Sequence, residues 1–230
     1  MKKITNLLLL SLFISFSFFS CSSDSSNDEV TGGISTGDYW PTTVGNSWVF
    51  TQEGEESTMK IIGSDEMGGA KYYKFDQMAG VGASLTGEVS SWIKKNQGDY
   101  YLKLGDINID LQGFTGKVTG YEFLFFKDYL DVNQTWTGKY THTTSYNIPN
   151  FPSIVTNVNY TGKILEKGAS VILNGVTFKD VIKFRFTQVA SITGQSTSEV
   201  ISEYWIAKNI GLIKADNNGT FTELKSYIIK

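Results

Sequence analysis

The sequence predicts an all-β protein, mostly antiparallel, whose folded part is a single domain built as a twisted sheet, a half-barrel or a sandwich. Apolar and polar residues alternate in segments such as 181–189 (VIKFRFTQV), which places apolar side chains on one face of a strand. Asn174-Gly175 lies between two β-branched runs, and this pair tolerates the positive φ angles of a type I′ hairpin turn. The whole chain contains three prolines, and its pattern shows no long amphipathic helix.

The first element is a secretory signal peptide, residues 1–20. Lys2 and Lys3 form a short cationic start, and Ile4–Phe19 is a mostly apolar run shorter than the ~18 residues expected of a spanning helix. The run ends beside Cys21, the only cysteine of the chain. A secreted protein with one unpaired cysteine is unusual, and attachment of lipid to Cys21 accounts for it.

The junction Phe18-Phe19-Ser20-Cys21 resembles the lipobox of bacterial lipoproteins, although such boxes usually carry Leu and a small residue where Phe18 and Phe19 stand. The resemblance implies a diacylglyceryl thioether on Cys21, removal of the preceding peptide and acylation of the new amino terminus. Acyl chains that bury methylenes at about 0.8 kcal/mol each then hold the protein on a membrane without a spanning helix. The alternative is a plain signal peptide with Cys21 as a free thiol.

The second element, residues 21–37, is predicted to be a disordered tether that carries the lipidated cysteine. It is rich in serine and contains Asp24, Asp28 and Glu29, and such a segment buries too little apolar surface to offset its conformational entropy. It resembles the acidic signal that sends lipoproteins of Bacteroidota-type bacteria to the cell surface. We therefore expect a lipid-anchored outer-membrane protein at the cell surface, or otherwise at the periplasmic face if the acids only solvate a linker.

The third element, residues 38–230, is the antiparallel β domain. Turn signals at 96–99 and 217–219 predict two further hairpins. The run 121–130 (YEFLFFKDYL) predicts either a short helix or a buried strand, because apolar runs of this length are ambiguous.

Two segments of this domain resemble each other: 38–50 (DYWPTTVGNSWVF) and 128–140 (DYLDVNQTWTGKY) both lead from Asp-Tyr through a turn to a Trp in a strand. The first carries the pattern Y-x-P-x-x-x-G-N-x-W-x-[YF], formed by Tyr39, Pro41, Gly45, Asn46, Trp48 and Phe50. On this pattern the chain resembles a group of uncharacterised Bacteroidota-type outer-membrane lipoproteins, and segments 175–186 and 203–214 are similar to that group's closing hairpins. The resemblance implies location and architecture but no activity. Trp48 is interpreted as a packing residue.

Several kinds of chemistry are disfavoured by composition. Arg185 is the only arginine and the net charge is −3, so nucleic acid is an unexpected partner, because arginine is the usual reader of phosphates and guanine edges. One histidine, His142, and one cysteine cannot supply the usual zinc ligands, and alternation in its segment predicts that His142 is an exposed strand residue. Segment 80–87 (GVGASLTG) lacks the spacing of a nucleophile elbow. No catalytic residue, metal or cofactor is predicted.

Weaker candidates remain for binding. Asp106, Asn108 and Asp110 match the first places of an EF-hand loop, but Leu111 and Lys117 occupy its Gly and Glu places, which favours a strand with a polar face. The acids in or beside predicted strands, none of which forms an obvious catalytic pair, are Glu88, Glu122, Asp180, Glu199 and Glu203. Tryptophans considered as sugar-stacking residues are Trp40, Trp92 and Trp136.

Three functions follow from these observations. The favoured one is a non-catalytic lipoprotein, attached to the membrane through lipidated Cys21, that binds a glycan, a peptide or a protein partner. The second is a carrier whose half-open barrel holds a lipid, and the third is a glycan hydrolase that uses two carboxylates. Solvent-facing aromatics favour the binder, a deep apolar cavity the carrier, and two buried acids beside a cleft the enzyme. The ligand-binding residues and the oligomeric state are not predicted.

Overall fold

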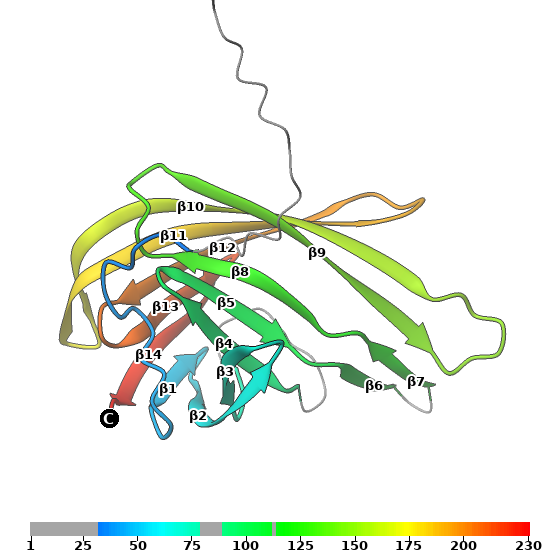
Figure 1. The fold of residues 1–230 in the computed structure, drawn as a ribbon, viewed down its shortest axis with the longest axis horizontal. Coiled ribbons are helices and arrows are strands. Elements are labelled where there is room, and N and C mark those ends of the chain that lie inside the picture. Colours follow the sequence, from blue (N-terminus) through cyan, green and yellow to red (C-terminus); the bar gives the residue numbers. More distant parts are fainter. Residues whose placement is uncertain (1–31, 79–88, 112–113) are drawn as a thin grey trace, which may run out of the picture. The chain divides into compact units, whose positions relative to one another are not determined.

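The structure, a computed structural model, describes residues 32–78, 89–111 and 114–230 (Figure 1). These residues form antiparallel strands and no helix. The strands are β1 (Ser47–Gln52), β2 (Glu55–Met67), β3 (Ala70–Phe75), β4 (Ser91–Asn96), β5 (Asp99–Leu104), β6 (Ile107–Leu111), β7 (Phe114–Val118), β8 (Tyr121–Lys127), β9 (Thr135–Tyr146), β10 (Ile154–Leu173), β11 (Val176–Ile192), β12 (Ser198–Ala207), β13 (Gly211–Asn217) and β14 (Thr220–Ile228). The predicted all-β antiparallel class is confirmed.

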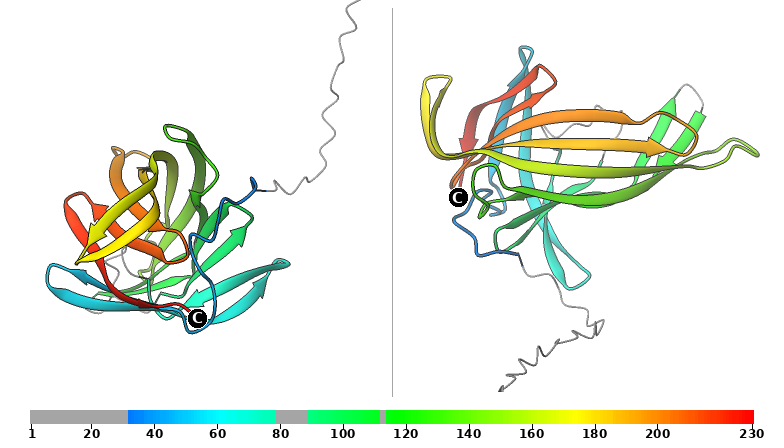
Figure 2. Two further views of the ribbon diagram at one scale, coloured as in Figure 1. Left: turned by 90° about the vertical axis from the view of Figure 1, so that its left-hand side faces the viewer. Right: turned by 90° about the horizontal axis from the view of Figure 1, so that it is seen from above.

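All these strands belong to one sheet, in the order β6-β7-β9-β10-β11-β12-β13-β14-β1-β2-β3-β4-β5-β8. The order divides into two six-stranded meanders. One contains β9 to β14, and the other contains β1 to β5 followed by β8, with the β6–β7 hairpin inserted before β8. The meanders are joined by pairing of β14 with β1. In the views of Figure 2 the sheet coils around a common interior.

The two similar segments found in the sequence lead into the first strand of each meander. Trp48 lies on β1 and Trp136 on β9, and both are buried. The indole N–H of Trp48 donates to the carbonyl of Ile210 at 2.6 Å, and that of Trp136 donates to the carbonyl of Leu124 at 3.2 Å. The fold therefore uses both tryptophans in the same way, each as a buried side chain that also satisfies a backbone carbonyl.

The sheet is open, because β6 and β8 are its two ends, yet β8 lies beside β9. Side chains bridge these two strands. Leu124 of β8 donates its backbone N–H to the Tyr160 hydroxyl at 3.1 Å and accepts from Trp136 through its carbonyl. Gly138 and Gly162 make room for these rings, since a Cβ at either would lie 2.1 Å from Tyr160 or Trp136. Two aromatic side chains thus satisfy an edge-strand residue that has no ladder partner there.

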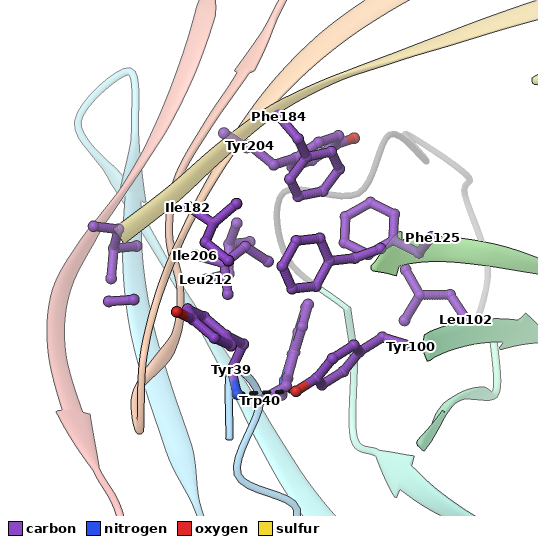
Figure 3. Packing of buried hydrophobic residues seen from close by; sticks show 14 of the residues in the cluster. Tyr39, Trp40, Tyr100, Leu102, Phe125, Ile182, Phe184, Tyr204, Ile206 and Leu212 are labelled. Carbon is purple, nitrogen blue, oxygen red and sulfur yellow. Dashed lines mark hydrogen bonds between the residues drawn. The ribbon is translucent and has the colours of Figure 1, made fainter. Parts of the chain in front are cut away.

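The interior is filled by side chains from both meanders (Figure 3). Phe125 of β8 packs edge-on against Phe184 and Tyr204, with ring centroids 5.2 and 4.9 Å apart. Tyr100 of β5 is buried and its hydroxyl accepts the backbone N–H of Tyr39 at 3.0 Å. Edge-to-face aromatic pairs add to the stabilisation from burial alone, so the core joins the two meanders.

The local predictions about turns are confirmed. Asn174 and Gly175 connect β10 to β11 with φ angles of 49° and 77°, as a type I′ turn requires. Gln97-Gly98 connects β4 to β5, and Asn218-Gly219 connects β13 to β14. The ambiguous segment 121–130 is resolved in favour of a strand, because β8 occupies most of it.

The residues of the opening pattern have structural roles. Gly45 has a φ of 93° and donates its N–H to the carbonyl of Ile61 at 2.8 Å. Asn46 is fully buried, donates to the carbonyl of Pro41 at 3.0 Å, and accepts the backbone N–H of Lys230 at 2.9 Å. Asn46 thus links the segment before β1 to the end of the chain.

Hydrogen bonds to the sheet begin before Asp38, the predicted start of the domain. Thr36 donates its backbone N–H to Asp128 at 3.0 Å, and Ser35 donates its hydroxyl to the same carboxylate at 2.6 Å. Lys208 donates to the carbonyl of Thr36 at 3.0 Å. Residues 35–38 therefore lie against the turns at one end of the sheet.

Candidate functional site

The three tryptophans considered for stacking have different positions in the structure. Trp40 is fully buried and Trp136 is 5% exposed, so both belong to the core and neither can present a ring to a ligand. Trp92 of β4 is half-buried and alternates with the buried Ile93. Alternation places Trp92 on the outer face of the sheet, away from the core.

Contacts at both ends hold the indole of Trp92 along the sheet surface. Its N–H donates to Asp65 of β2 at 2.7 Å. Its six-membered ring lies over Gly105, where an added Cβ would come within 3.3 Å of the ring. The Lys74 ammonium lies 5.7 Å from the indole centroid. Trp92 is therefore a fixed aromatic surface at the outer face of β2–β5, surrounded by charged groups.

A polar and aromatic cluster lies next to Trp92 on the same face. Lys94 bonds the Glu122 carboxylate at 2.6 Å and the Tyr72 hydroxyl at 3.0 Å, and its ammonium lies 4.3 Å from the Tyr101 ring centroid. Burial lowers the pKa of Lys94, but its hydrogen bonds to Glu122 and Tyr72 outweigh burial and raise it. Lys94 is consequently charged and held in place at neutral pH. We call Trp92, Lys74, Tyr72, Lys94, Tyr101, Lys103 and Glu122 the Trp92 face.

Strand register places part of this face in a transverse row. Lys74 of β3 is paired with Trp92 of β4, Trp92 with Lys103 of β5, and Lys103 with Glu122 of β8. The Lys103 ammonium lies 3.9 Å from the Glu122 carboxylate. Neighbouring strands thus present Lys, Trp, Lys and Glu in that order.

The same row occurs in the other meander. Lys183 of β11 is paired with Trp205 of β12, Trp205 with Lys214 of β13, and Lys214 with Glu223 of β14. The two ammonium groups lie 4.4 and 5.2 Å from the Trp205 centroid, and Lys214 bonds Glu223 at 2.6 Å. Trp205 is half-buried on the outer face, like Trp92.

The sequence analysis did not select Trp205, although a signal for it exists. Residues 92–98 (WIKKNQG) and 205–211 (WIAKNIG) share the pattern W-I-x-K-N-x-G. Ile93 and Ile206 are fully buried, whereas Lys95 and Lys208 hold the segment before β1 through the Asp38 carboxylate and the Thr36 carbonyl. Both tryptophans lie on the outer face of the sheet, where Trp205 also packs against the core cluster.

The candidate carboxylates do not converge on one site. Glu122 lies on β8, Glu199 and Glu203 lie on β12, and Asp180 lies on β11 with a φ of 52°. Glu203 accepts two hydrogen bonds from Arg185, at 2.7 and 3.1 Å. Glu88 lies outside the described residues. Glu122 and Glu203 therefore supply ion pairs, with Lys94 and with Arg185.

Among the residues that the structure describes, the buried carboxylates are Asp99 and Asp128, which are 1% and 0% exposed and were not predicted from the sequence. Lys127 bonds both oxygens of Asp99 at 3.0 and 3.3 Å. Asp128 accepts from Ser35 and Thr36. Each carboxylate is thus compensated by donors of the fold itself, as buried charges must be.

His142 lies on β9, as predicted, but the prediction that it is exposed is wrong. The side chain is half-buried, with ring centroids 5.6 Å from Tyr121 and 6.4 Å from Tyr140, which themselves stack at 4.4 Å. Alternation along β9 placed its ring on the inner face, where β8 packs. Burial lowers the pKa of His142 below its ordinary value.

The segment tested as a calcium loop forms β6, with Ile107 buried and Asn108 and Asp110 exposed. This confirms the strand with a polar face. Asp106 bonds Lys117 at 2.6 Å and accepts the N–H of Gly120 at 2.8 Å, so its oxygens stabilise the β6–β7 hairpin. Across the described part of the chain, no group of three or more His, Cys, Asp or Glu side chains is arranged to hold a metal ion.

The predicted lipid anchor Cys21 and the segment 80–87 lie outside the described residues. Within the described ranges, no helix is long and apolar enough to cross a membrane.

Comparisons with known proteins support the fold. No protein-family model matches the sequence, and no curated protein matches it. Among solved structures, the chain is similar to a "putative lipoprotein" from Parabacteroides distasonis ATCC 8503, whose crystal structure was determined at 2.70 Å resolution. The two share 12% sequence identity with a TM-score of 0.53, over 84% of this chain and 99% of that chain. At this identity the likeness shows a common fold.

Proposed function

We propose that this protein is a lipid-anchored lipoprotein of the bacterial outer membrane whose β domain binds carbohydrate without cleaving it. The observation that carries the binding proposal is the Trp92 face, where an aromatic ring is fixed on the outer surface among hydrogen-bonding side chains. The apolar C–H face of a sugar ring packs on a flat indole, and its hydroxyls pair with ammonium and carboxylate groups beside it.

The charges of this face favour a neutral sugar. Glu122 bonds Lys94 at 2.6 Å and lies 3.9 Å from Lys103, and the Asp65 carboxylate accepts from the Trp92 indole. Cations that are already paired, as Lys94 and Lys103 are, offer little net attraction to a polyanion. Sugar hydroxyls both donate and accept, so they can use both members of each pair.

The two alternatives are less well supported by the geometry. A lipid carrier requires an apolar cavity, whereas aromatic and aliphatic side chains from both meanders pack together inside the coiled sheet (Figure 3). A hydrolase requires acids poised beside a cleft, whereas Asp99 and Asp128 are bonded to Lys127 and to Ser35 and Thr36.

The anchoring proposal is supported by the lipobox-like junction at Cys21 and by the shared fold of the Parabacteroides distasonis protein. It is tested by fractionating cells that express the wild type or Cys21→Ala, after metabolic labelling with an alkyne fatty acid. Labelled wild-type protein in the outer-membrane fraction is expected, with unlabelled variant released. Protease treatment of intact cells then removes the protein if it faces outward, and a labelled Cys21→Ala protein contradicts the anchor.

The binding proposal is tested by electrophoresis of purified full-length protein through native gels that contain soluble neutral polysaccharides: starch, mannan, xylan and hydroxyethyl cellulose. At least one polysaccharide is expected to retard the wild type, and Trp92→Ala is expected to reduce this retardation. Phe151→Ala is the matched control, because Phe151 is an aromatic residue 46% exposed in the turn between β9 and β10. Equal retardation of Trp92→Ala and the wild type contradicts the proposal.

A further inference from the structure

The Trp205 row matches the Trp92 face too closely for unrelated surface residues. Both rows occupy consecutive strands of a meander, β3-β4-β5-β8 in one and β11-β12-β13-β14 in the other. Both present Lys, Trp, Lys and Glu through cross-strand pairing. Both tryptophans begin the pattern W-I-x-K-N-x-G. The two meanders therefore present the same four-residue row on the outer face of the sheet.

From this match we infer that the protein has a second carbohydrate site, centred on Trp205, and that it binds two separate stretches of neutral glycan at once. The inference rests on the proposed function of the Trp92 face.

The cations around Trp205 are paired with carboxylates, as Lys94 and Lys103 are at the first site. Lys183 bonds Glu166 at 2.6 Å, Lys214 bonds Glu223 at 2.6 Å, and Arg185 bonds Glu203 at 2.7 Å. Every cation of this cluster thus has a carboxylate partner, so the surface favours neutral hydroxyl groups over anions. Phe221, 47% exposed, lies 4.5 Å from the Lys214 ammonium and extends the aromatic surface.

The position of the lysines defines how a sugar would reach Trp205. Two ammonium groups flank the indole, at 4.4 and 5.2 Å from its centroid. Each belongs to a long side chain that is also ion-paired, Lys183 with Glu166 and Lys214 with Glu223, and a cation–π contact at a partly exposed site is weak. A sugar ring can therefore displace one ammonium from the ring and accept a hydrogen bond from it.

The two sites lie on separate parts of the coiled sheet. Trp205 on β12 and Trp92 on β4 are separated by six strand-to-strand steps in the sheet order, which is roughly 30 Å along the sheet at about 4.8 Å per step. The sheet coils between them (Figure 2), so their outer faces point in different directions. Each site then binds its own stretch of a polymer, and binding to a polysaccharide gains from multivalency.

The test is isothermal titration calorimetry of full-length protein with malto-, cello-, manno- and xylotetraose, followed by the polysaccharide built from the same sugar as the tetraose that binds. Two tetrasaccharide sites per chain are expected for the wild type, and one each for Trp92→Ala and Trp205→Ala. Either single variant is expected to bind the polysaccharide at least tenfold more weakly than the wild type. Phe151→Ala should keep two sites.

The outcomes separate the two proposals. One site in the wild type that persists in Trp205→Ala and disappears in Trp92→Ala overturns the second site and leaves the proposed function standing. No binding of any tetrasaccharide or polysaccharide overturns both. The fold of Trp205→Ala is verified by the unchanged affinity of its remaining Trp92 site. If that variant does not fold, Lys183→Ala with Lys214→Ala replaces it and should weaken only one of the two sites, whereas two unaltered sites overturn the inference.

Discussion

Asp128 is the residue that attaches the start of the described chain to the sheet. Its buried carboxylate accepts from Ser35 and Thr36 and lies 3.2 Å from the Tyr100 hydroxyl. We expect Asp128→Ala to lower the free energy of unfolding by about 2–3 kcal/mol, because it removes the bonds to Ser35 and Thr36 and leaves the buried Tyr100 hydroxyl without this acceptor. Hydrogen exchange at residues 35–37 should accelerate. Asp131→Ala, an exposed neighbour in the same loop, should change stability by less than about 0.5 kcal/mol, and equal effects would refute this role.

His142 offers a residue-scale test of how β8 meets β9. Burial against Tyr121 and Tyr140 lowers the pKa of His142 below its ordinary value of 6.5. The unfolded chain then binds the proton more tightly, so this residue contributes stability above pH 6.5 that is lost as pH falls through the folded pKa. His142 is the only histidine, so its ring protons give one assignable NMR titration. A pKa of 6.5 or higher would show that the ring is not buried.

At the scale of elements, the contact between β8 and β9 depends on the Tyr160 and Trp136 rings, which lie against Gly138 and Gly162. An alanine Cβ at Gly138 would lie 2.1 Å from the Tyr160 hydroxyl, whereas one at Gly63 of β2 meets nothing within 4 Å. We expect Gly138→Ala to destabilise the fold by about 1–3 kcal/mol through overpacking, and Gly63→Ala to be neutral or stabilising. Urea denaturation of both variants measures this, and similar midpoints would contradict the role of Gly138.

The contact between β8 and β9 also contains a hydrogen bond to the Tyr160 hydroxyl. Tyr160→Phe removes the acceptor of the Leu124 N–H while keeping the ring, and should cost about 1–2 kcal/mol of unfolding free energy. The matched control is Tyr227→Phe, since Tyr227 is 41% exposed. If both variants unfold at the same urea concentration, the Tyr160 hydroxyl does not stabilise the edge of β8.

The elements show which parts of the structure are predictable from sequence and which are not. Hairpins such as the one at Asn174-Gly175 depend on local turn chemistry, and alternation such as that of 181–189 depends on one strand. Both were therefore predicted. The prediction that His142 is exposed was wrong because β8 packs against the face of β9 that carries this residue. Alternation along β9 alone does not show which face another strand covers. Trp92 could be proposed from the sequence as one of three tryptophans that stack on a sugar. Only the pairing of β3, β4, β5 and β8 shows that Lys74, Lys103 and Glu122 form a row with it.

At the scale of the whole molecule, tyrosines buried inside the coiled sheet are expected to make the protein less stable at alkaline pH. Desolvation raises the pKa of Tyr204 to about 12 and also raises the pKa of Tyr100 and Tyr160. The unfolded chain ionises first, so the stability that these tyrosines contribute is constant below pH 10 and falls as pH rises from 10 towards 12. Urea midpoints between pH 8 and 11.5 measure this fall, which should be shallower in Tyr204→Phe. An unchanged slope in that variant would contradict the assignment.

The whole molecule contains five tryptophans. Their positions allow sugar binding at Trp92 and Trp205 to be tested in one NMR spectrum. Trp40, Trp48 and Trp136 are buried, whereas Trp92 and Trp205 lie on the outer face. The most direct measurement is an ¹⁵N–¹H NMR titration of the full-length protein with the neutral tetrasaccharide that binds. If both outer tryptophans bind sugar, the indole signals of Trp92 and Trp205 shift while the three core signals remain in place. Shifts confined to the core tryptophans, or none at saturating sugar, would contradict this binding.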